Sequence, residues 1–240
     1  MQKEKNETGE GFNDFIQKHR KLIYVIIGLI ILLLLASIAA FSLMDVFRER
    51  AISTVEDFNS RYESIRSSII ESEAESENEG ESEDGEAAES ETDREIAQLL
   101  AELEPFAGKT SGYAGGKAWS IIAAIYSEKK EWEKAETAWA AAAGKSAKSY
   151  FEPIAWFNAG IAAEEQGKTT EAIDYYTKSI AAPAGFSSAP RAQFSIGRLH
   201  EAINENDAAI AAYRAVIAGW PLDQTWTSLA NSRIITLENN

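Results

Sequence analysis

The hydropathy pattern begins with a continuous apolar run near the N-terminus. Residues 22–44 read LIYVIIGLIILLLLASIAAFSLM, which is 23 residues without a charged side chain. A helix of that length spans about 35 Å, which is enough to cross the ~30 Å hydrocarbon core of a bilayer. The run therefore predicts a single transmembrane helix over residues 22–44, in direct contact with lipid.

A cleaved signal peptide is the alternative interpretation of this run. Signal peptides have a shorter apolar segment of roughly 7–15 residues, and here 21 residues of mixed charge come first, so an uncleaved anchor is favoured. Lys18, Arg20 and Lys21 stand directly before the run, and a more balanced mixture of charges follows it. Because basic residues concentrate on the cytoplasmic side, we expect residues 1–21 to form a cytoplasmic tail and the rest of the chain to lie outside the cytoplasm.

An amphipathic pattern follows over residues 45–70 and predicts a juxtamembrane helix. Its apolar positions are spaced alternately four and three residues apart, as on one face of a helix. These positions are Ala51, Val55, Phe58, Tyr62, Ile65 and Ile69. Two partners fit this face: a second copy of the chain, giving a homodimer through residues 51–69, or the distal domain of the same chain.

The next segment, residues 71–93, is strongly acidic. It contains twelve of the 38 acidic residues and no basic residue, so it accounts for most of the net charge of −15. Three alanines are its only apolar side chains, which is too little buried surface to offset the entropy of ordering. We therefore predict an acidic disordered linker over residues 71–93 that separates the juxtamembrane helix from a domain over residues 94–240.

Within that domain the pattern repeats every 37 residues, in segments that start at Trp119, Trp156 and Gln193. Three columns recur: a small residue (Ala123, Gly160, Gly197), an alanine (Ala135, Ala172, Ala209) and an aromatic residue (Trp139, Tyr176, Tyr213). Each segment predicts two helices joined by a short polar turn, with the small residues allowing close approach. Because one helix pair cannot bury its apolar face, the pairs should stack into an all-α solenoid. Residues 93–106 and 224–237 should cap the three pairs.

These columns resemble those of the tetratricopeptide repeat. The family's Trp–Leu–Gly–Tyr and Ala–Phe–Ala–Pro columns correspond in the first copy to Trp119, Ile122, Ala123, Tyr126, Ala135, Trp139 and Ala142. In the second copy they correspond to Trp156, Ala159, Gly160, Ala163, Ala172, Tyr176 and Ser179, and in the third to Gln193, Ile196, Gly197, His200, Ala209, Tyr213, Val216 and Pro221. The family period is about 34 residues, so each copy here carries about three extra residues in its helices or loops.

Composition offers little for catalysis. The chain has no cysteine and only two histidines, which removes thiolate chemistry and leaves few ligands for a metal. His200 takes a column in which the family packs a tyrosine, and the Gly112–Gly116 stretch lacks the strand that a nucleotide-binding loop needs. The acidic balance argues against nucleic acid as a partner. We therefore predict a protein that is not an enzyme and that has no cofactor or metal.

The resemblance implies a binding groove instead, because the family's first helices line a concave surface. The corresponding positions here are Lys117, Ser120, Ile154, Phe157, Asn158, Ile161, Arg191, Phe194, Arg198 and Glu201. An apolar patch beside arginines suits an extended or helical peptide with an apolar anchor and an acidic group. Alternatively, Phe157 and Phe194 pack between repeats and do not contact a ligand.

The arrangement of a short tail, one span, a juxtamembrane helix and terminal repeats resembles the YfgM-type ancillary subunits of the bacterial SecYEG translocon. Residues 111–119 and 228–240 are similar to the entry and the end of that family's helical domain. The resemblance implies a scaffold in the bacterial inner membrane with a periplasmic domain. Its partners would be the translocon, periplasmic chaperones and newly exported chains. An adaptor for another envelope-assembly complex, of the cell wall or outer membrane, is the alternative.

Overall fold

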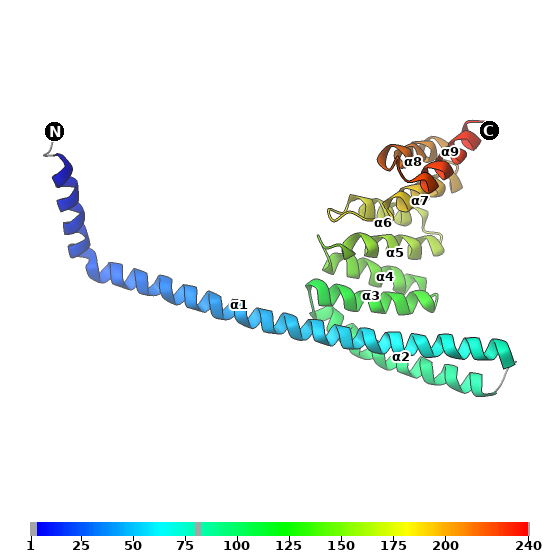
Figure 1. Ribbon diagram of the computed structural model, residues 1–240, viewed down its shortest axis with the longest axis horizontal. Coiled ribbons are helices and arrows are strands. Elements are labelled where there is room, and N and C mark those ends of the chain that lie inside the picture. Colours follow the sequence, from blue (N-terminus) through cyan, green and yellow to red (C-terminus); the bar gives the residue numbers. More distant parts are fainter. Residues whose placement is uncertain (1–3, 80–82, 240) are drawn as a thin grey trace. The chain divides into compact units, whose positions relative to one another are not determined.

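The computed structural model describes residues 4–79 and 83–239, and within them the side chains of residues 17–22, 24–71 and 91–239. Every regular element in this part of the chain is an α-helix (Figure 1). The helices are α1 (Glu4–Glu79), α2 (Glu83–Lys109), α3 (Gly112–Glu128), α4 (Trp132–Lys145), α5 (Phe151–Glu165), α6 (Thr169–Ala181), α7 (Ala189–Ala202), α8 (Asn206–Gly219) and α9 (Gln224–Glu238). They belong to two compact units, Met1–Arg50 and Ala51–Asn240, and α1 contributes to both.

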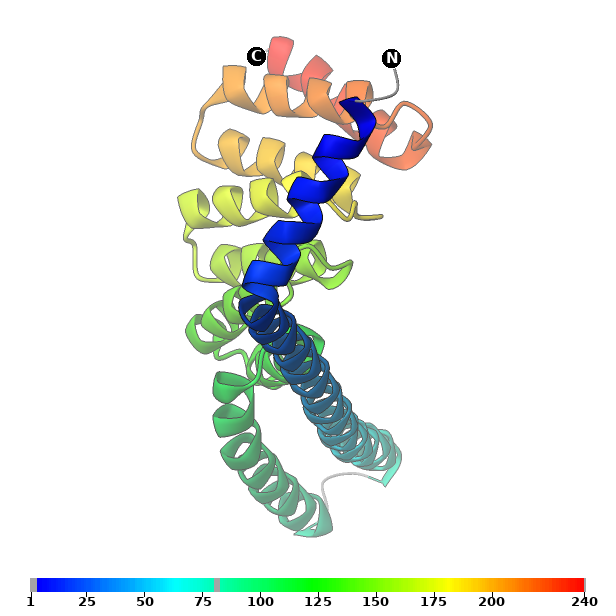
Figure 2. The ribbon, with the colours of Figure 1, turned by 90° about the vertical axis from the view of Figure 1, so that its left-hand side faces the viewer.

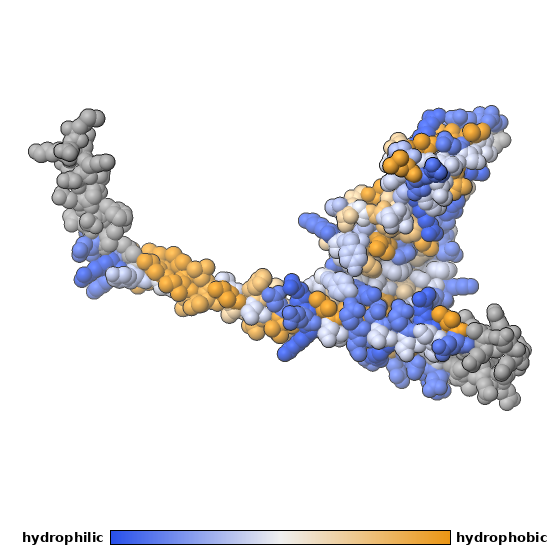
Figure 3. Space-filling model, in the orientation of Figure 1, coloured by the Kyte–Doolittle hydropathy of each residue, from blue (hydrophilic) through white to orange (hydrophobic). Residues whose placement is uncertain are grey.

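In the first unit, α1 carries the apolar run on all of its faces. The described side chains of residues 22–44 are exposed, with Leu33 at 67% and Phe41 at 68%, and they form the continuous apolar band visible in Figure 3. Within the described residues, α1 is the helix that is long and apolar enough to cross a membrane, and the candidate segment is Gln17–Glu71. A helix that is apolar all round needs an apolar environment, so this unit is a candidate membrane anchor.

The second unit begins with the amphipathic part of α1, which packs against α2 and α3. Val55, Phe58, Tyr62 and Ile65 are buried in one cluster with residues of those two helices, and the rings of Phe58 and Phe106 meet edge to face at 5.5 Å. The prediction that this face packs on the distal domain is confirmed. The homodimer predicted through residues 51–69 is not shown by the structure, in which the apolar surface expected to form it is covered within the chain.

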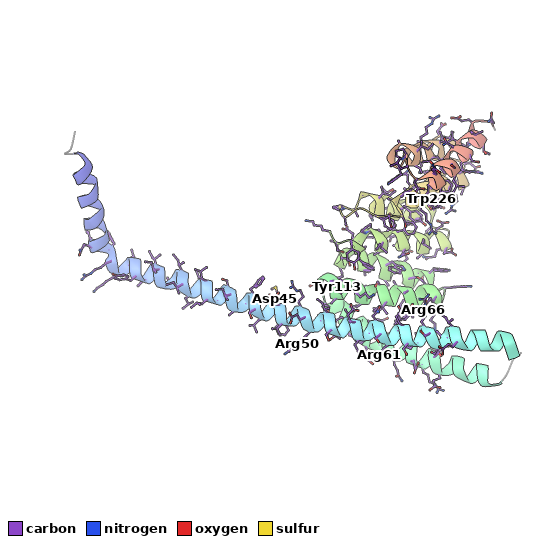
Figure 4. All side chains as sticks on the ribbon, in the orientation of Figure 1. Asp45, Arg50, Arg61, Arg66, Tyr113 and Trp226 are labelled. Atoms are coloured by element: carbon purple, nitrogen blue, oxygen red, sulfur yellow. The ribbon has the colours of Figure 1, made fainter. Side chains whose placement is uncertain are left out.

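Polar contacts align α1 with its two neighbours (Figure 4). The Arg61 guanidinium donates to both carboxylate oxygens of Glu102 on α2, at 2.7 and 3.1 Å, and this hydrogen bonding lowers the pKa of Glu102. Arg66 pairs with Glu128, at the C-terminal end of α3, at 3.0 Å. The hydroxyl of Tyr113, at the start of α3, donates to Glu56 at 2.8 Å. α3 therefore runs parallel to this part of α1.

The acidic segment differs from its prediction. The sequence predicts a disordered linker over residues 71–93, whereas α1 continues to Glu79 and α2 begins at Glu83; residues 80–82 lie outside the described part. Glutamate and alanine are good helix formers. Each helix here also extends from a packed segment, through Ile65 on α1 and Leu99 on α2, so the acidic residues lengthen existing helices and need not nucleate new ones.

The remaining helices form the three predicted pairs, α3–α4, α5–α6 and α7–α8. Each second helix also contacts the first helix of the next pair, α5 contacts α3, and α9 contacts both α7 and α8. Figure 2 shows the helices stacked in chain order. α9 caps the last pair by burying Ala230 and Ile234 against Tyr213 and Val216. At the other end, α1 joins α2 as a helix pair, where the sequence predicts only a capping helix.

Each first helix ends in the same left-handed turn. Lys130, Gly167 and Asn204 lie 37 residues apart and have φ values of 57°, 72° and 61°. The next residue closes each turn: the backbone amides of Glu131, Lys168 and Glu205 each donate to the carbonyl five residues earlier, at 2.8–3.0 Å. Glycine adopts this conformation without the strain that a Cβ adds, and asparagine tolerates it better than most residues. Lys130 is therefore the least favourable residue of the three.

Replacing Lys130 with glycine should stabilise the protein. The substitution removes the left-handed strain at φ 57° and should raise the free energy of unfolding by about 0.5–1 kcal/mol. The neighbouring Lys129→Gly variant is the matched control, because Lys129 has an ordinary φ of −74° and glycine there should be neutral or destabilising. Urea unfolding followed by circular dichroism measures both. Equal changes in the two variants would contradict this account of the turn.

Candidate functional site

The candidate site is built on a close contact within each helix pair. A Cβ placed on Gly160 would lie 2.7 Å from the ring of Tyr176, and a Cβ on Gly197 would lie 2.6 Å from the ring of Tyr213. Ala123 takes the same place in the first pair, where it is fully buried. The small residue in each first helix therefore sets how closely the second helix approaches.

A polar contact also recurs once in each pair, at the C-terminal end of the first helix. The aromatic residue of the second helix donates to a side chain twelve residues earlier: Trp139 to Ser127 at 3.1 Å, Tyr176 to Glu164 at 3.0 Å and Tyr213 to Glu201 at 2.9 Å. Burial raises the pKa of Tyr176, and the charge of Glu164 adds to that rise. The phenols therefore remain protonated donors at neutral pH.

Arginines extend these contacts from one repeat to the next. Arg198 on α7 pairs with Glu164 on α5, and Arg233 on α9 pairs with Glu201 on α7. The sequence suggests that Arg198 and Glu201 face a ligand, but in the structure both engage partners within the chain. The acidic group expected to meet Arg198 is supplied by Glu164. Arg233 was missed because it lies in the capping helix, two residues before Ile235, which takes the column that Arg198 occupies.

Two of the predicted apolar groove residues pack between helices. Phe157 is only 7% exposed and contacts the rings of Tyr176 and Phe186, with centroid distances of 5.4 and 5.3 Å. Phe194 is half-buried between Tyr213 and Trp226, at 5.1 and 5.4 Å. Both phenylalanines therefore pack between helices, as the alternative to ligand contact predicts.

The other predicted residues differ in how accessible they are. Ser120 is buried, and its hydroxyl donates to the carbonyl of Lys117 at 2.7 Å. Lys117, Ile154, Asn158 and Ile161 are half-buried, and Arg191 is exposed with its guanidinium 5.2 Å from the centroid of Phe157. Lys117, Ile154 and Arg191 occupy the same column of the repeat, one on each first helix. The accessible part of the predicted groove is therefore apolar on α5 and basic on α3 and α7.

A polar centre on the second helices was not predicted. Glu136 on α4 accepts from Gln166 and Lys168, both at 2.9 Å, and from the hydroxyl of Tyr175 at 3.2 Å. Burial raises the pKa of Glu136, but the hydrogen bonds from Lys168 and Gln166 outweigh it, so the pKa is lowered. Burial and the nearby Glu136 charge raise the pKa of Tyr175 to about 12. No repeat column marks this residue, because Ile173 takes the corresponding place in the next copy.

The histidine and the glycine-rich stretch that were considered for catalysis both make contacts that belong to the fold. His200 is half-buried, and its Nδ1 lies 2.7 Å from Glu205 in the turn after α7. Gly112–Gly116 begins helix α3, where a Cβ on Gly115 would lie 2.4 Å from the carbonyl oxygen of Thr110. Among the described residues, no group of three or more histidine, cysteine or acidic side chains is placed to hold a metal ion.

Comparisons with known proteins identify the class of protein. The sequence model described as Tetratricopeptide repeat matches residues 122–186 and 184–223. A protein of Treponema pallidum (strain Nichols) named "TPR repeat-containing protein" is 32% identical over 225 residues, which cover 93% of this chain and 91% of the relative. The chain therefore belongs to the tetratricopeptide-repeat family. Repeats of this family mediate interactions between proteins and typically act as non-enzymatic scaffolds.

A solved structure supports the fold. The crystal structure of Podosopora anserina putative kinesin light chain nearly identical TPR-like repeats matches with a TM-score of 0.50 and 12% identity. The match covers 74% of this chain and 87% of that chain. At this identity the similarity concerns the helical solenoid alone.

Enlarging Gly197 should destabilise the stack. In Gly197→Ala the new methyl group meets the ring of the fully buried Tyr213 at 2.6 Å, and the required shift should cost about 1–3 kcal/mol. Gly144→Ala is the control, because a Cβ there has no atom within 4 Å and alanine favours the helix. Thermal unfolding followed by circular dichroism compares the two. A Gly197→Ala variant as stable as Gly144→Ala would contradict the close-contact account.

The stability contributed by Glu136 should depend on pH. Its pKa lies below the ordinary value of 4.5, so its contribution is present above that value and is lost as the pH falls through the lowered pKa. Glu136→Gln should lower the free energy of unfolding by about 1–2 kcal/mol at pH 7 and by much less near pH 3. Urea unfolding at both pH values tests this. The exposed Glu133→Gln on the same helix should have little effect at either pH, and a pH-independent loss in Glu136→Gln would refute the ion-pair contribution.

Proposed function

We propose that the protein is a membrane-anchored scaffold whose helix-pair stack binds another protein outside the cytoplasm. The observation that carries the proposal is a set of side chains on successive first helices that keep part of their surface accessible: Lys117, Ile154, Asn158, Ile161 and Arg191. Of these, Ile161 also packs against the cluster around Phe157 and Tyr176. Tetratricopeptide repeats bind proteins, and this set offers apolar contacts flanked by cations. It suits an extended or helical segment with an apolar side chain and a carboxylate.

The apolar run of α1 supports the anchor. Residues 22–44 have the length and the all-round apolar surface of a membrane-spanning helix,. Lys18, Arg20 and Lys21 before the run favour a cytoplasmic N-terminus,. In a bacterial cell this topology places the second unit in the periplasm. There the layout resembles that of ancillary translocon subunits, and we propose that the partners are the Sec translocon, periplasmic chaperones and chains emerging from export.

Topology and partners can be tested in the native membrane. The full chain should resist alkaline carbonate extraction, and protease added to spheroplasts should degrade the second unit while the N-terminal tail remains protected. A photo-crosslinking residue at Asn158 should recover translocon subunits or periplasmic chaperones. Recovery of a cell-wall or outer-membrane assembly complex in their place would favour the adaptor function, and protease resistance in intact spheroplasts would refute the proposed orientation.

A charge introduced on the first helices tests the binding face itself. Asn158→Arg places a bulky cation between the apolar positions Ile154 and Ile161 and, with the photo-crosslinking residue moved to Lys117, should reduce partner crosslinking by at least about tenfold. Ala211→Arg is the control, because Ala211 is exposed on a second helix, α8. Circular dichroism should report the same helix content for both variants. Equal crosslinking by the Asn158→Arg and Ala211→Arg variants would mean that the first helices do not form the binding site.

A further inference from the structure

The two ends of the helix stack differ in what they expose. At the N-terminal end, the packed part of α1 exposes charged residues, among them Asp57 and Glu63. At the C-terminal end, the last helix of the described stack is α9, which stands alone and not in a pair (Figure 1). Terminal units of repeat stacks need a polar outer face to remain soluble, because an exposed apolar face associates. The outer face of α9 therefore indicates whether this end meets water or another protein.

α9 has neighbouring helices on one side only. α5 lies between the second helices α4 and α6, and α7 lies between α6 and α8, whereas α9 contacts α8 and α7. The buried residues of α9, Ala230 and Ile234, both belong to the cluster with Tyr213 and Val216 of α8. Within the described chain, no helix lies on the opposite side of α9, where the earlier first helices each have one. The stacking interface of the solenoid thus continues onto a side that this chain leaves open.

The open side of α9 carries apolar and small neutral side chains. Helix geometry places Ser228, Ser232 and Ile235 opposite the buried pair, with Leu229 at the margin. Ile235 is 61% exposed and Leu229 is 44% exposed, and Leu222, in the turn before α9, is 94% exposed. Apolar residues are visible at this end of the stack in Figure 3. The cap therefore lacks the polar outer face that an open end needs.

The charges of α9 are already paired within the chain. Arg233 pairs with Glu201, and Glu238 pairs with Arg214 of α8 at 2.8 Å. The other exposed residues of α9 are neutral, and charged residues are depleted in the buried centres of protein interfaces. A strongly charged partner would gain no charge pairing on this face. Two copies of a chain with a net charge of −15 can meet here without like-charge repulsion.

We infer that α9 binds α9 of a second copy of this chain, so that two stacks join end to end. A contact between two identical faces closes as a two-fold dimer. When the two helices cross antiparallel at Ser232, the two copies of this small side chain meet at the two-fold axis and allow close approach. Leu229 and Ile235, three residues to either side of Ser232, then surround the axis in both copies.

Association through α9 depends on neither the anchor nor the binding face of the proposed function. The dimer presents the accessible residues of the first helices twice, which raises the avidity for a partner with repeated segments. One helix from each copy makes a contact smaller than the standard interface of about 1,600 Å². We therefore expect a dissociation constant in the micromolar range.

Disulfide trapping tests the contact directly, because the chain has no cysteine. Ser232→Cys and the control Thr177→Cys, which is exposed on α6, are prepared as full chains in mild detergent and treated with a mild oxidant. Ser232→Cys should form a covalent dimer at least about tenfold faster than Thr177→Cys, because two cysteines at the axis lie within disulfide distance. Equal rates would overturn the inference, and so would a Ser232→Cys disulfide that forms in native membranes only with a different protein.

Charge exchange at Ile235 distinguishes a second copy from any other occupant of the face. Ile235→Glu and Ile235→Lys each place two like charges in the contact, so each variant should sediment as a monomer under conditions in which the unaltered full chain sediments as a dimer. An equimolar mixture of the two variants should restore the dimer, because opposite charges then face each other. Thr177→Glu is the matched control and should leave the dimer unchanged.

The helix content measured by circular dichroism should be the same in all of these variants, because Ile235 and Thr177 are both exposed. A dimer that Ile235→Glu leaves intact would mean that another surface joins the copies and would overturn the inference. An unaltered chain that remains monomeric well above micromolar concentrations, or a mixture of the two charge variants that remains monomeric, would overturn it as well.

Discussion

The contact between a small residue and an aromatic ring inside each helix pair is the constraint on which the stack depends. Gly160 and Gly197 leave no room for a methyl group beside Tyr176 and Tyr213, so the two helices of a pair have one permitted separation. The same phenols donate to Glu164 and Glu201, and these glutamates accept from arginines of the next repeat. Steric contact within a pair and ion pairing between pairs thus involve the same residues. A change in one pair therefore affects how the next pair is placed.

α1 combines two kinds of surface in one helix. Its first part is apolar on every face, whereas from Ala51 onward a single apolar face is buried on α2 and α3. The candidate anchor and the start of the folded domain are therefore consecutive stretches of the same helix, with no long flexible segment between Met44 and Ala51.

For binding, the packing contacts matter because they remove residues from the set available to a partner. Phe157, Phe194, Arg198 and Glu201 carry the chemistry expected of a peptide-binding groove, yet each has neighbours within the chain. The accessible surface is consequently smaller, less aromatic and less acidic than the repeat columns suggest. Recognition would depend on moderate apolar contact with Ile154 and Ile161 and on the cations of Lys117 and Arg191.

The sequence by itself determined the features that repeat or that arise from local periodicity. Four features could be predicted in this way: the apolar run, the three helix pairs, their small and aromatic columns, and the capping helix over residues 224–237. They could be predicted because helix geometry places regularly spaced residues on one face. Tertiary structure alone decided contacts between segments that do not repeat: the packing of the juxtamembrane face on α2 and α3, the helical course of the acidic residues, the pairing of Arg233 with Glu201 and the polar centre at Glu136. Those contacts depend on how loops and the twist of the stack bring distant residues together, and no spacing along the chain encodes that.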